Sequence, residues 1–185
     1  MDVFLETERL VLRRLIPTDV DDLVALDGDP VVMAFLSGGK PTPRADVEQA
    51  LRQLIDDYAR FDGLGRYAAI DKSTGDFLGW MSLAADGTDE VDLGYRLRAS
   101  AWGKGYATEG ARALVATAFT EFPIERVRAD TMAVNSRSRA VMERAGLRFI
   151  RVFHLHFDDP IPGTELGEVE YAITRTEWEH SRKPD

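Results

Sequence analysis

The chain has 185 residues, and this length favours a single globular domain that spans residues 1–185. Apolar residues make up 44% of it, but no run approaches the roughly 18 apolar residues that a membrane-spanning helix needs. Cysteine is absent, which excludes disulfides and zinc–thiolate sites. The formal net charge of −9 argues against a nucleic-acid partner, because such partners favour a basic surface. No leader sequence is visible at the start, so we expect a cytoplasmic protein without a membrane partner.

Hydrophobic periodicity predicts the element order β-α-α-β-β-β-α-β-α-β-β along the chain. A short helix is expected around residues 20–24, where apolar residues recur at helical spacing. Longer helices are expected over 42–63, 108–121 and 135–145. Strands are expected over 9–15, 67–71, 77–83, 91–97, 126–131, 149–157 and 168–174. The second to fourth strands form an antiparallel meander, and the crossover helix at 108–121 implies a mixed sheet flanked by helices, an α/β (α+β) fold.

The most informative segment runs from Val91 to Glu109, where a strand leads through a glycine-rich turn into a helix. Gly103 and Gly105 permit positive φ angles and close approach of a ligand to the backbone. The unpaired N–H groups and the dipole of the helix start favour an anion there, and Lys104 adds a positive charge. Thr108 stands where the pattern G-x-G-x-x-G needs its last glycine, and no Walker sequence is present. The segment therefore predicts a site for a phosphate-bearing ligand, against the alternatives of a plain strand-to-helix turn and of a nucleotide-binding protein.

This turn resembles the motif Q/R-x-x-G-x-G/A of the GNAT superfamily of acyl-CoA-dependent N-acetyltransferases. Gly105 and Ala107 match the small residues of the motif, whereas Trp102 stands in the place of Gln or Arg. Residues 135–138 (NSRS) and 146–149 (GLRF) are similar to a second motif, N-x-x-S/A followed by G-F after a helix. Together with the opening TERLVLRRL, the pattern is similar to that of the RimJ/RimL-type branch.

The resemblance implies a GNAT-like, mostly antiparallel sheet whose fourth and fifth strands splay apart into a wedge. Acetyl-CoA would lie in this wedge, with its pantetheine arm along the backbone of the fourth strand and its pyrophosphate on the glycine turn. An amine acceptor, either a protein N-terminus or a small-molecule amine, would attack the thioester directly in a ternary complex. The residues that the resemblance places near acetyl-CoA are Arg96, Leu97, Arg98, Trp102, Gly103, Lys104, Gly105, Tyr106, Ala107, Thr108, Asn135, Ser138 and Met142.

Three residues are implied in catalysis: Asp92, Asn135 and Ser138. The usual general acid of the family is a tyrosine four residues before the glycine that ends the helix, and Met142 occupies that position here. Ser138 is then expected to assist departure of the CoA thiolate, although a serine also suits an early helical position. Asn135 is expected both to cap the helix and to contact the pantetheine. Asp92 shares its strand face with Arg96, so we expect it to face the wedge and to help deprotonate the amine, directly or through water.

Other polar and aromatic residues carry weaker signals. His154 and His156 are predicted two apart on one strand face, but no third ligand is evident, so no metal is expected. Acceptor recognition is expected at Arg14, Phe35, Arg66 and Trp80, while Tyr95 is expected to form a pocket wall, and Arg137 and Arg139 to reach the adenosine 3′-phosphate. A homodimer is a further expectation. The competing hypothesis is a CoA-binding sensor or scaffold without transferase activity, because Met142 removes the usual acid.

Overall fold

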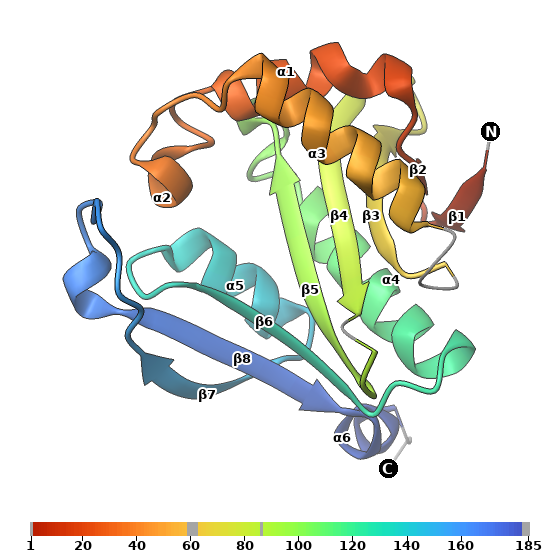
Figure 1. Cartoon of the computed structure of the whole chain (residues 1–185). Helices are drawn as coiled ribbons and strands as arrows, with labels where there is room; N and C mark the ends of the chain where they lie inside the picture. Colours follow the sequence, from red (N-terminus) through yellow and green to blue (C-terminus); the bar gives the residue numbers. More distant parts are fainter. Residues whose placement is uncertain (1, 59–62, 86, 183–185) are drawn as a thin grey trace.

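A computed structural model describes residues 2–58, 63–85 and 87–182, and an eight-stranded sheet forms its centre (Figure 1). The strand order is β1-β2-β3-β4-β5-β6-β8-β7. Neighbouring strands are antiparallel except for β5 and β6, which are parallel. The mixed, mostly antiparallel sheet expected from the sequence is therefore confirmed. The strands are β1 Val3–Glu6, β2 Leu10–Arg14, β3 Gly65–Asp71, β4 Phe77–Ala85, β5 Glu90–Leu97, β6 Arg126–Met132, β7 Arg148–Phe153 and β8 Glu168–Thr174.

Helices cover both faces of this sheet. Figure 1 shows α1 and α3 in front of β2 to β5, and α4 behind them. The helices are α1 Val20–Gly28, α2 Ala34–Ser37, α3 Arg44–Asp57, α4 Tyr106–Glu121, α5 Ser136–Arg144 and α6 Arg175–Ser181. Among the described helices, none combines the length and the apolar character that crossing a lipid bilayer requires.

Alternation along the strands divides the buried side chains between two layers. On the α4 side, Met81 and Leu93 pack with Leu114 of α4 in the larger core. On the other side, Ala68 and Trp80 pack against α1 and α3 in a second core. The odd-numbered residues of β5 thus face α4, and its even-numbered residues face the opposite side of the sheet, which we call the front face.

Gly110 sets how closely α4 approaches the sheet. A Cβ placed on this residue would lie 2.1 Å from Sδ of Met81 and 3.3 Å from Cδ1 of Leu10. Any larger side chain would push α4 away from β2 and β4. The glycine therefore fixes the position of the helix whose first turn faces the predicted anion site.

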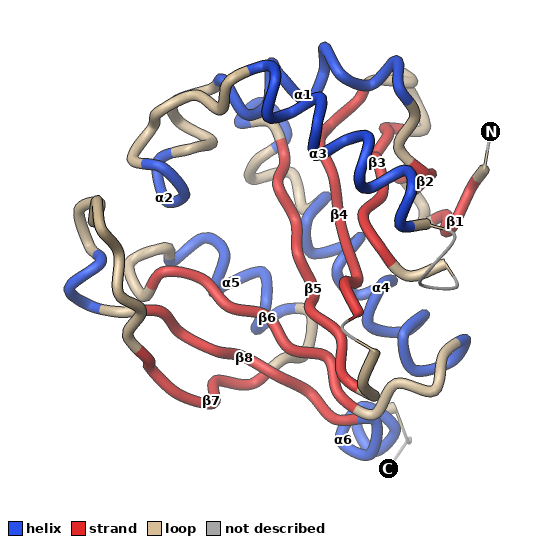
Figure 2. Tube along the Cα trace, viewed as in Figure 1, coloured by secondary structure: helices blue, strands red, loops and turns tan. Residues whose placement is uncertain are grey.

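The sheet splits into a wedge between β5 and β6, which Figure 2 shows as two diverging strands. These strands pair only through Glu90–Arg126, Val91–Val127 and Asp92–Arg128. Beyond that point β5 continues to Leu97 without β6 beside it, while β6 stays paired with β8. The expected wedge is present, but it lies between the fifth and sixth strands, because β1 precedes the first strand that the sequence predicted.

Several predicted boundaries were wrong. The strand expected over 149–157 is β7, which ends at Phe153, because its partner β8 begins at Glu168 opposite that residue. The helix expected from 108 begins at Tyr106. The helix expected over 42–63 begins at Arg44 and ends at Asp57, and residues 59–62 of its expected range lie outside the described residues. Three short elements, β1, α2 and α6, were not predicted.

Candidate active site

The turn between β5 and α4 has the backbone geometry of an anion site. Gly103 and Gly105 have φ angles of 72° and 86°, and Gly105 is the N-cap of the 16-residue helix α4. A Cβ built on Gly103 would meet nothing within 4 Å, so this backbone faces open space. Tyr106, Ala107 and Thr108 form the first turn of α4, whose N–H groups have no acceptor within the helix. Together with Lys104, which is exposed, the turn fits the pyrophosphate of a CoA-type molecule.

Residues of the N-terminal segment brace this turn. Arg9 donates a hydrogen bond of 2.9 Å to the carbonyl of Lys104 and pairs with Glu109 of α4 at 2.6 Å. The hydroxyl of Thr7 donates to the same carboxylate at 2.6 Å. Partial burial opposes ionisation, but these hydrogen bonds hold the pKa of Glu109 below its usual value. The opening TERL thus supplies a support for the helix start, a role that the sequence did not indicate.

Trp102 closes the end of β5. Its indole Nε1 donates a hydrogen bond of 2.8 Å to the carbonyl of Leu97, so this carbonyl, one of the groups expected to pair with pantetheine, already has a partner. The guanidinium carbon of Arg137 lies 5.1 Å from the centre of the Trp102 ring. Arg139, by contrast, donates hydrogen bonds to Tyr171 and to the carbonyl of Ala133. Of the two arginines expected near the adenosine phosphate, Arg137 is therefore the one beside the turn.

The side chains of Arg96 and Arg98 lie against α1. Arg96 pairs with Asp27 at 2.6 Å, and Arg98 pairs with Asp22 at 2.6 Å. The two arginines therefore fasten β5 to the helix in front of it. Their contribution to a pantetheine site would come from the backbone, as the sequence analysis expected.

Ser138 and Tyr95 meet across the wedge. Asn135 caps α5, since its Oδ1 accepts a hydrogen bond from the Ser138 N–H at 3.2 Å, and its Nδ2 donates to Thr131 at 3.1 Å. The Tyr95 hydroxyl lies 3.0 Å from both the carbonyl oxygen and Oγ of Ser138. Burial raises the pKa of Tyr95 to about 12, so its hydroxyl keeps its proton at neutral pH. Tyr95 is thus a hydrogen-bonding partner of Ser138 as well as part of the wall.

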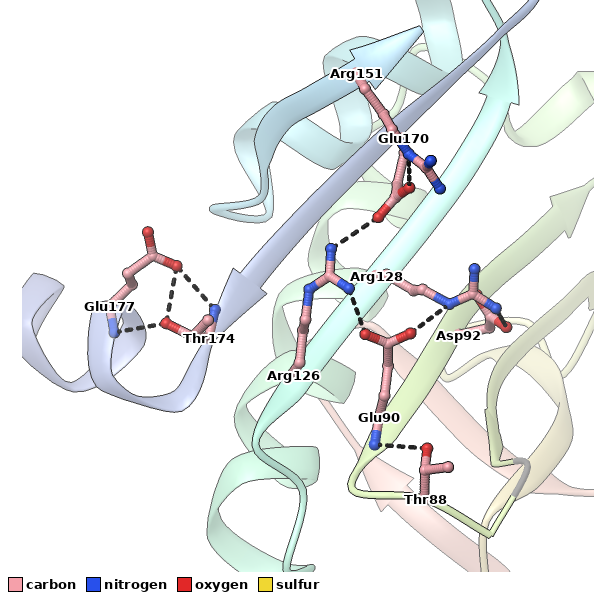
Figure 3. Close-up of polar contacts among 9 residues, drawn as sticks. All are labelled: Thr88, Glu90, Asp92, Arg126, Arg128, Arg151, Glu170, Thr174 and Glu177. Carbon is pink, nitrogen blue, oxygen red and sulfur yellow. Dashed lines mark hydrogen bonds and ion pairs between the residues drawn. The ribbon is translucent and has the colours of Figure 1, made fainter. Parts of the chain in front are cut away.

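Asp92 lies at the closed end of the wedge, on the front face (Figure 3). Its Oδ2 accepts a hydrogen bond of 2.7 Å from Arg128, which also pairs with Glu90 at 2.9 Å. Partial burial raises the pKa of Asp92, and Arg128 opposes this shift. The carboxylate therefore lies on the expected side of the sheet, but it is engaged by an arginine.

Glu168 is a second carboxylate on the front face, and the sequence analysis missed it. It begins β8 opposite Met132 and is 8% exposed. Burial and the charge of Asp130 raise the pKa of Glu168. Within the described part of the chain, no cation or hydrogen-bond donor pairs with its side chain. Alternation along residues 168–174 places Glu168 and Glu170 on one face of the strand. No feature of the sequence indicates which of the two glutamates has no arginine as an ion-pair partner.

The remaining predicted residues lie elsewhere. Met142 is 2% exposed and belongs to the core on the α4 side. The expectation that His154 and His156 share a strand face was wrong, because both follow the end of β7. His156 is 94% exposed, with Nε2 3.9 Å from Asp158. Among residues 2–58, 63–85 and 87–182, no cluster of three His, Cys, Asp or Glu side chains could hold a metal ion.

Comparison with known proteins identifies the family. Residues 9–148 match the model of the acetyltransferase (GNAT) domain, so the chain belongs to the GNAT family. It is an acyl-CoA-dependent acetyltransferase, and acetyl-CoA is its cosubstrate. The glycine turn, the helix start and the wedge described above are the parts of the fold that fit this cosubstrate.

One relative and two solved structures illustrate the similarity. An Aspergillus fumigatus protein named FsC-acetyl coenzyme A-N(2)-transacetylase is 36% identical over 189 aligned residues, which cover 97% of this chain and 80% of the relative. RimL, a ribosomal L7/L12 alpha-N-protein acetyltransferase solved with coenzyme A, matches with a TM-score of 0.78 at 19% identity, over 94% of this chain and 98% of that one. The spermidine N-acetyltransferase of Vibrio cholerae, solved with CoA and spermine, matches with a TM-score of 0.77 at 15% identity, over 94% and 99%. These two structures show a shared fold, and the RimJ/RimL-type branch stays a prediction.

Proposed function

We propose that this acetyltransferase acetylates the primary amine of a small molecule by direct attack on the thioester in a ternary complex. The observation that carries the proposal is the free stretch of β5 beyond Asp92, which carries Tyr95, the partner of Ser138, and leads toward the glycine turn. The name of the Aspergillus fumigatus relative specifies transfer to N(2), which favours one defined acceptor nitrogen. A protein N-terminus is the second candidate, the acceptor type in the name of the RimL structure.

The proposed binding mode places the two substrates on opposite faces of the sheet. The turn at Gly103 and Gly105 holds the pyrophosphate, and Arg137 and Trp102 flank it. The backbone of β5 then guides the acyl end through the wedge, since the unpaired N–H and C=O groups of a free strand edge bind an amide-containing chain as they bind a peptide. The acceptor approaches from the front face, where Glu168 lies.

In this mechanism two groups of the chain move protons. The amine nitrogen attacks the thioester carbon, the carbon–sulfur bond breaks, the nitrogen gives up a proton, and the thiolate must gain one. We propose that Glu168 accepts the proton of the amine, directly or through water. The Ser138 hydroxyl donates a proton to the departing sulfur and regains one from solvent, into which Glu168 later releases the proton of the amine. Tyr95 keeps its own proton and orients Ser138 through their hydrogen bond.

Release of free thiol from acetyl-CoA tests this proposal across a panel of protein N-terminal peptides, polyamines and amino acids. Ser138→Ala should lower kcat by about ten-fold to several hundred-fold, the scale of one lost proton-transfer partner, with little change in acetyl-CoA affinity. Ser136→Ala is the matched control, because Ser136 lies one residue into the same helix and is exposed.

Two results would contradict the proposal in different ways. Normal turnover of Ser138→Ala would remove this hydroxyl from the mechanism. A wild-type protein that binds acetyl-CoA but releases no thiol with any amine would favour the CoA-binding sensor or scaffold.

Three further expectations stay predictions. They are a single domain over residues 1–185, a cytoplasmic location and a homodimer. None of them enters the mechanism, which uses residues of one chain.

A further inference from the structure

Arg66 of β3 is a partly buried arginine that has no ion-pair partner among the described residues. Its Nε has no hydrogen-bond acceptor, and its guanidinium forms no ion pair among the described residues. The guanidinium carbon lies 3.9 Å from the centre of the Trp80 ring, which holds it in place by stacking. Burial and the nearby charge of Arg96 lower the pKa of Arg66. An unpaired buried cation destabilises a fold, so its presence calls for a functional reason.

The surroundings of Arg66 carry a surplus of positive charge and of hydrogen-bond donors. Arg96 lies on the same Trp80 ring, with its guanidinium carbon 5.3 Å from the ring centre. Asp27 is the carboxylate that pairs with Arg96, so two guanidinium groups share one negative charge. Nε of Arg96 and Nε1 of Trp80 are also buried without an acceptor among the described residues. This cluster therefore has three buried N–H groups without an acceptor among the described residues, a surplus of donors beside the Arg66 guanidinium.

The register of the strands places this cluster beside the proposed reaction site. Arg66 lies opposite Ser82, and Ser82 lies opposite Gly94 of β5. A Cβ on Gly94 would lie 3.4 Å from Cζ3 of Trp80, so the ring reaches the part of β5 that is free of β6. The Arg66 guanidinium, stacked on this ring, lies on the front face next to the wedge.

A pocket adjoins the cluster on the same face. Leu54, Ser82 and Ala84 line it with Arg66. Asp57 also lines this pocket, and its Oδ1 accepts a hydrogen bond of 3.1 Å from Nε2 of Gln53. The pocket therefore offers an apolar wall and a hydroxyl next to an arginine that lacks an anion.

We infer that Arg66, stacked on Trp80 and supported by Arg96, binds a carboxylate of the acceptor, so that the acceptor is an amine whose adjacent carbon carries a carboxylate. The inference rests on the proposed function and specifies its substrate class. One surplus positive charge matches a monoanion, and the planar guanidinium fork matches a carboxylate better than it matches a neutral oxygen. The same two arginines repel a polycation, so polyamines are disfavoured as acceptors.

Binding to the full chain loaded with CoA, in which no transfer can occur, tests the inference by calorimetry. Glycine, lysine and phenylalanine are compared with methylamine, cadaverine and phenethylamine, which lack the carboxylate. In at least one pair the amino acid should bind about ten-fold or more tightly, the scale of one charge-assisted hydrogen bond. Equal affinity within every pair, or no binding by any amino acid, would overturn the inference.

Variants of Arg66 give a second, independent measurement. Arg66→Gln should remove the preference for the carboxylate, and Arg66→Lys should not restore it, because an ammonium lacks the fork. Arg52→Gln is the control, since Arg52 is an exposed residue of α3. The melting temperature of ligand-free Arg66→Gln should equal or exceed that of the wild type, because the change removes a partly buried cation that has no ion-pair partner among the described residues. A lower melting temperature would mark Arg66 as structural and overturn the inference.

The two proposals fail in distinguishable ways. Acetyl transfer to amines regardless of a carboxylate would overturn the Arg66 site and leave the proposed function intact. Carboxylate-dependent binding without any acetyl transfer would overturn the proposed function and leave the Arg66 site intact.

Discussion

Burial raises the pKa of two carboxylates on the front face, Asp92 and Glu168, but their charged neighbours differ. Arg128 holds Asp92 at 2.7 Å and stabilises its ionised form. Glu168 has no such partner among the described residues, and Asp130 adds a like charge nearby. Glu168 is therefore the better acceptor for a proton. Its ionised form is destabilised by burial without a cation to offset this cost, so protonation lowers its free energy more than it lowers that of Asp92.

We therefore expect Glu168, and not Asp92, to set the acidic limb of the pH profile. Activity should rise with pH as Glu168 loses its proton, at a pH above the usual glutamate range. Glu168→Gln should remove this limb and lower kcat by about a hundred-fold, the lower end of general-base effects. Asp92→Asn is the matched control and should keep the limb, as measured by kcat over the pH range. Loss of the limb in Asp92→Asn with its retention in Glu168→Gln would return the base role to Asp92.

The same pKa shift has a consequence for stability. A glutamate whose folded pKa is raised stabilises the fold below its unfolded pKa, and this contribution is lost as the pH rises through the folded pKa. At neutral pH the ionised Glu168 thus costs stability, so Glu168→Gln should unfold at an equal or higher temperature than the wild type. The residue combines a cost in stability with a role in function, as expected of active-site groups.

Single residues of the site differ in how well the sequence predicted them. Asn135 and Ser138 lie within one helical turn, so a local motif was enough to pair the cap with the hydroxyl. Tyr95 and Glu168 acquire their properties from partners more than 35 positions away, or from the lack of them. Such pairings depend on strand register, which no short motif encodes.

At the scale of elements, the start of α4 is held from outside as well as by its own turn. Arg9 links the N-terminal segment both to the Lys104 carbonyl and to Glu109 in the first turn of the helix. These contacts of Arg9 hold the backbone at Gly103 and Gly105 in place, and no side chain of the described residues lies within 4 Å of a Cβ built on Gly103. The exposed N–H groups therefore remain available for an anion.

Alanine variants of two glycines, Gly103 in the turn before α4 and Gly75 in another turn, can distinguish the cost of backbone strain from the loss of ligand binding. Gly103 and Gly75 have φ angles of 72° and 77°, and an added Cβ would meet nothing within 4 Å at either position. Alanine at each should cost a similar stability of about 1 kcal/mol, because both positions are left-handed. Calorimetry should show a loss of acetyl-CoA affinity of about ten-fold or more for Gly103→Ala alone, since a methyl group there would project toward the pyrophosphate. Equal affinity in the two variants would place the pyrophosphate elsewhere.

Long elements were predicted well and short ones were not. The helix now bounded as Tyr106–Glu121 has apolar residues on one face over four turns, and this period identifies it. The strand Val3–Glu6 and the helix Ala34–Ser37 each span four residues, which is too short for either period to emerge. Residues 154–157 alternate like a strand, but β8 offers no backbone to pair with them, so tertiary structure overrides the local pattern.

At the scale of the whole molecule, Arg126 and Arg128 of β6 join the two halves of the sheet where the wedge closes. Arg126 of β6 pairs with Glu90 of β5 and, at 2.7 Å, with Glu170 of β8 (Figure 3). Arg151 of β7 reaches the other oxygen of Glu170, also at 2.7 Å. Since β5 and β6 share only three backbone pairs, these side chains reinforce the narrowest connection in the sheet.

Glu170 is the buried member of this network, so its loss should cost the most stability. Burial opposes its ionisation, but Arg151 and Arg126 lower the pKa of Glu170 below the usual value. Glu170→Gln keeps the shape and removes the charge, and it should cost about 1.5–3 kcal/mol, the range of charged hydrogen bonds. For a chain of this size the melting temperature should fall by roughly 3–12 °C. Arg151→Gln is the control and should cost less than about 1 kcal/mol, because the Arg151 side chain is 63% exposed.

The pH dependence of this difference gives the network a direct test. A carboxylate with a lowered folded pKa stabilises the fold above its unfolded pKa, and the contribution disappears as the pH falls through the folded pKa. Thermal unfolding of the wild type and of Glu170→Gln should thus differ fully at neutral pH and converge in acid, below the usual glutamate range. Arg151→Gln should stay close to the wild type throughout. A constant gap down to low pH would mean that Glu170 acts through packing rather than charge.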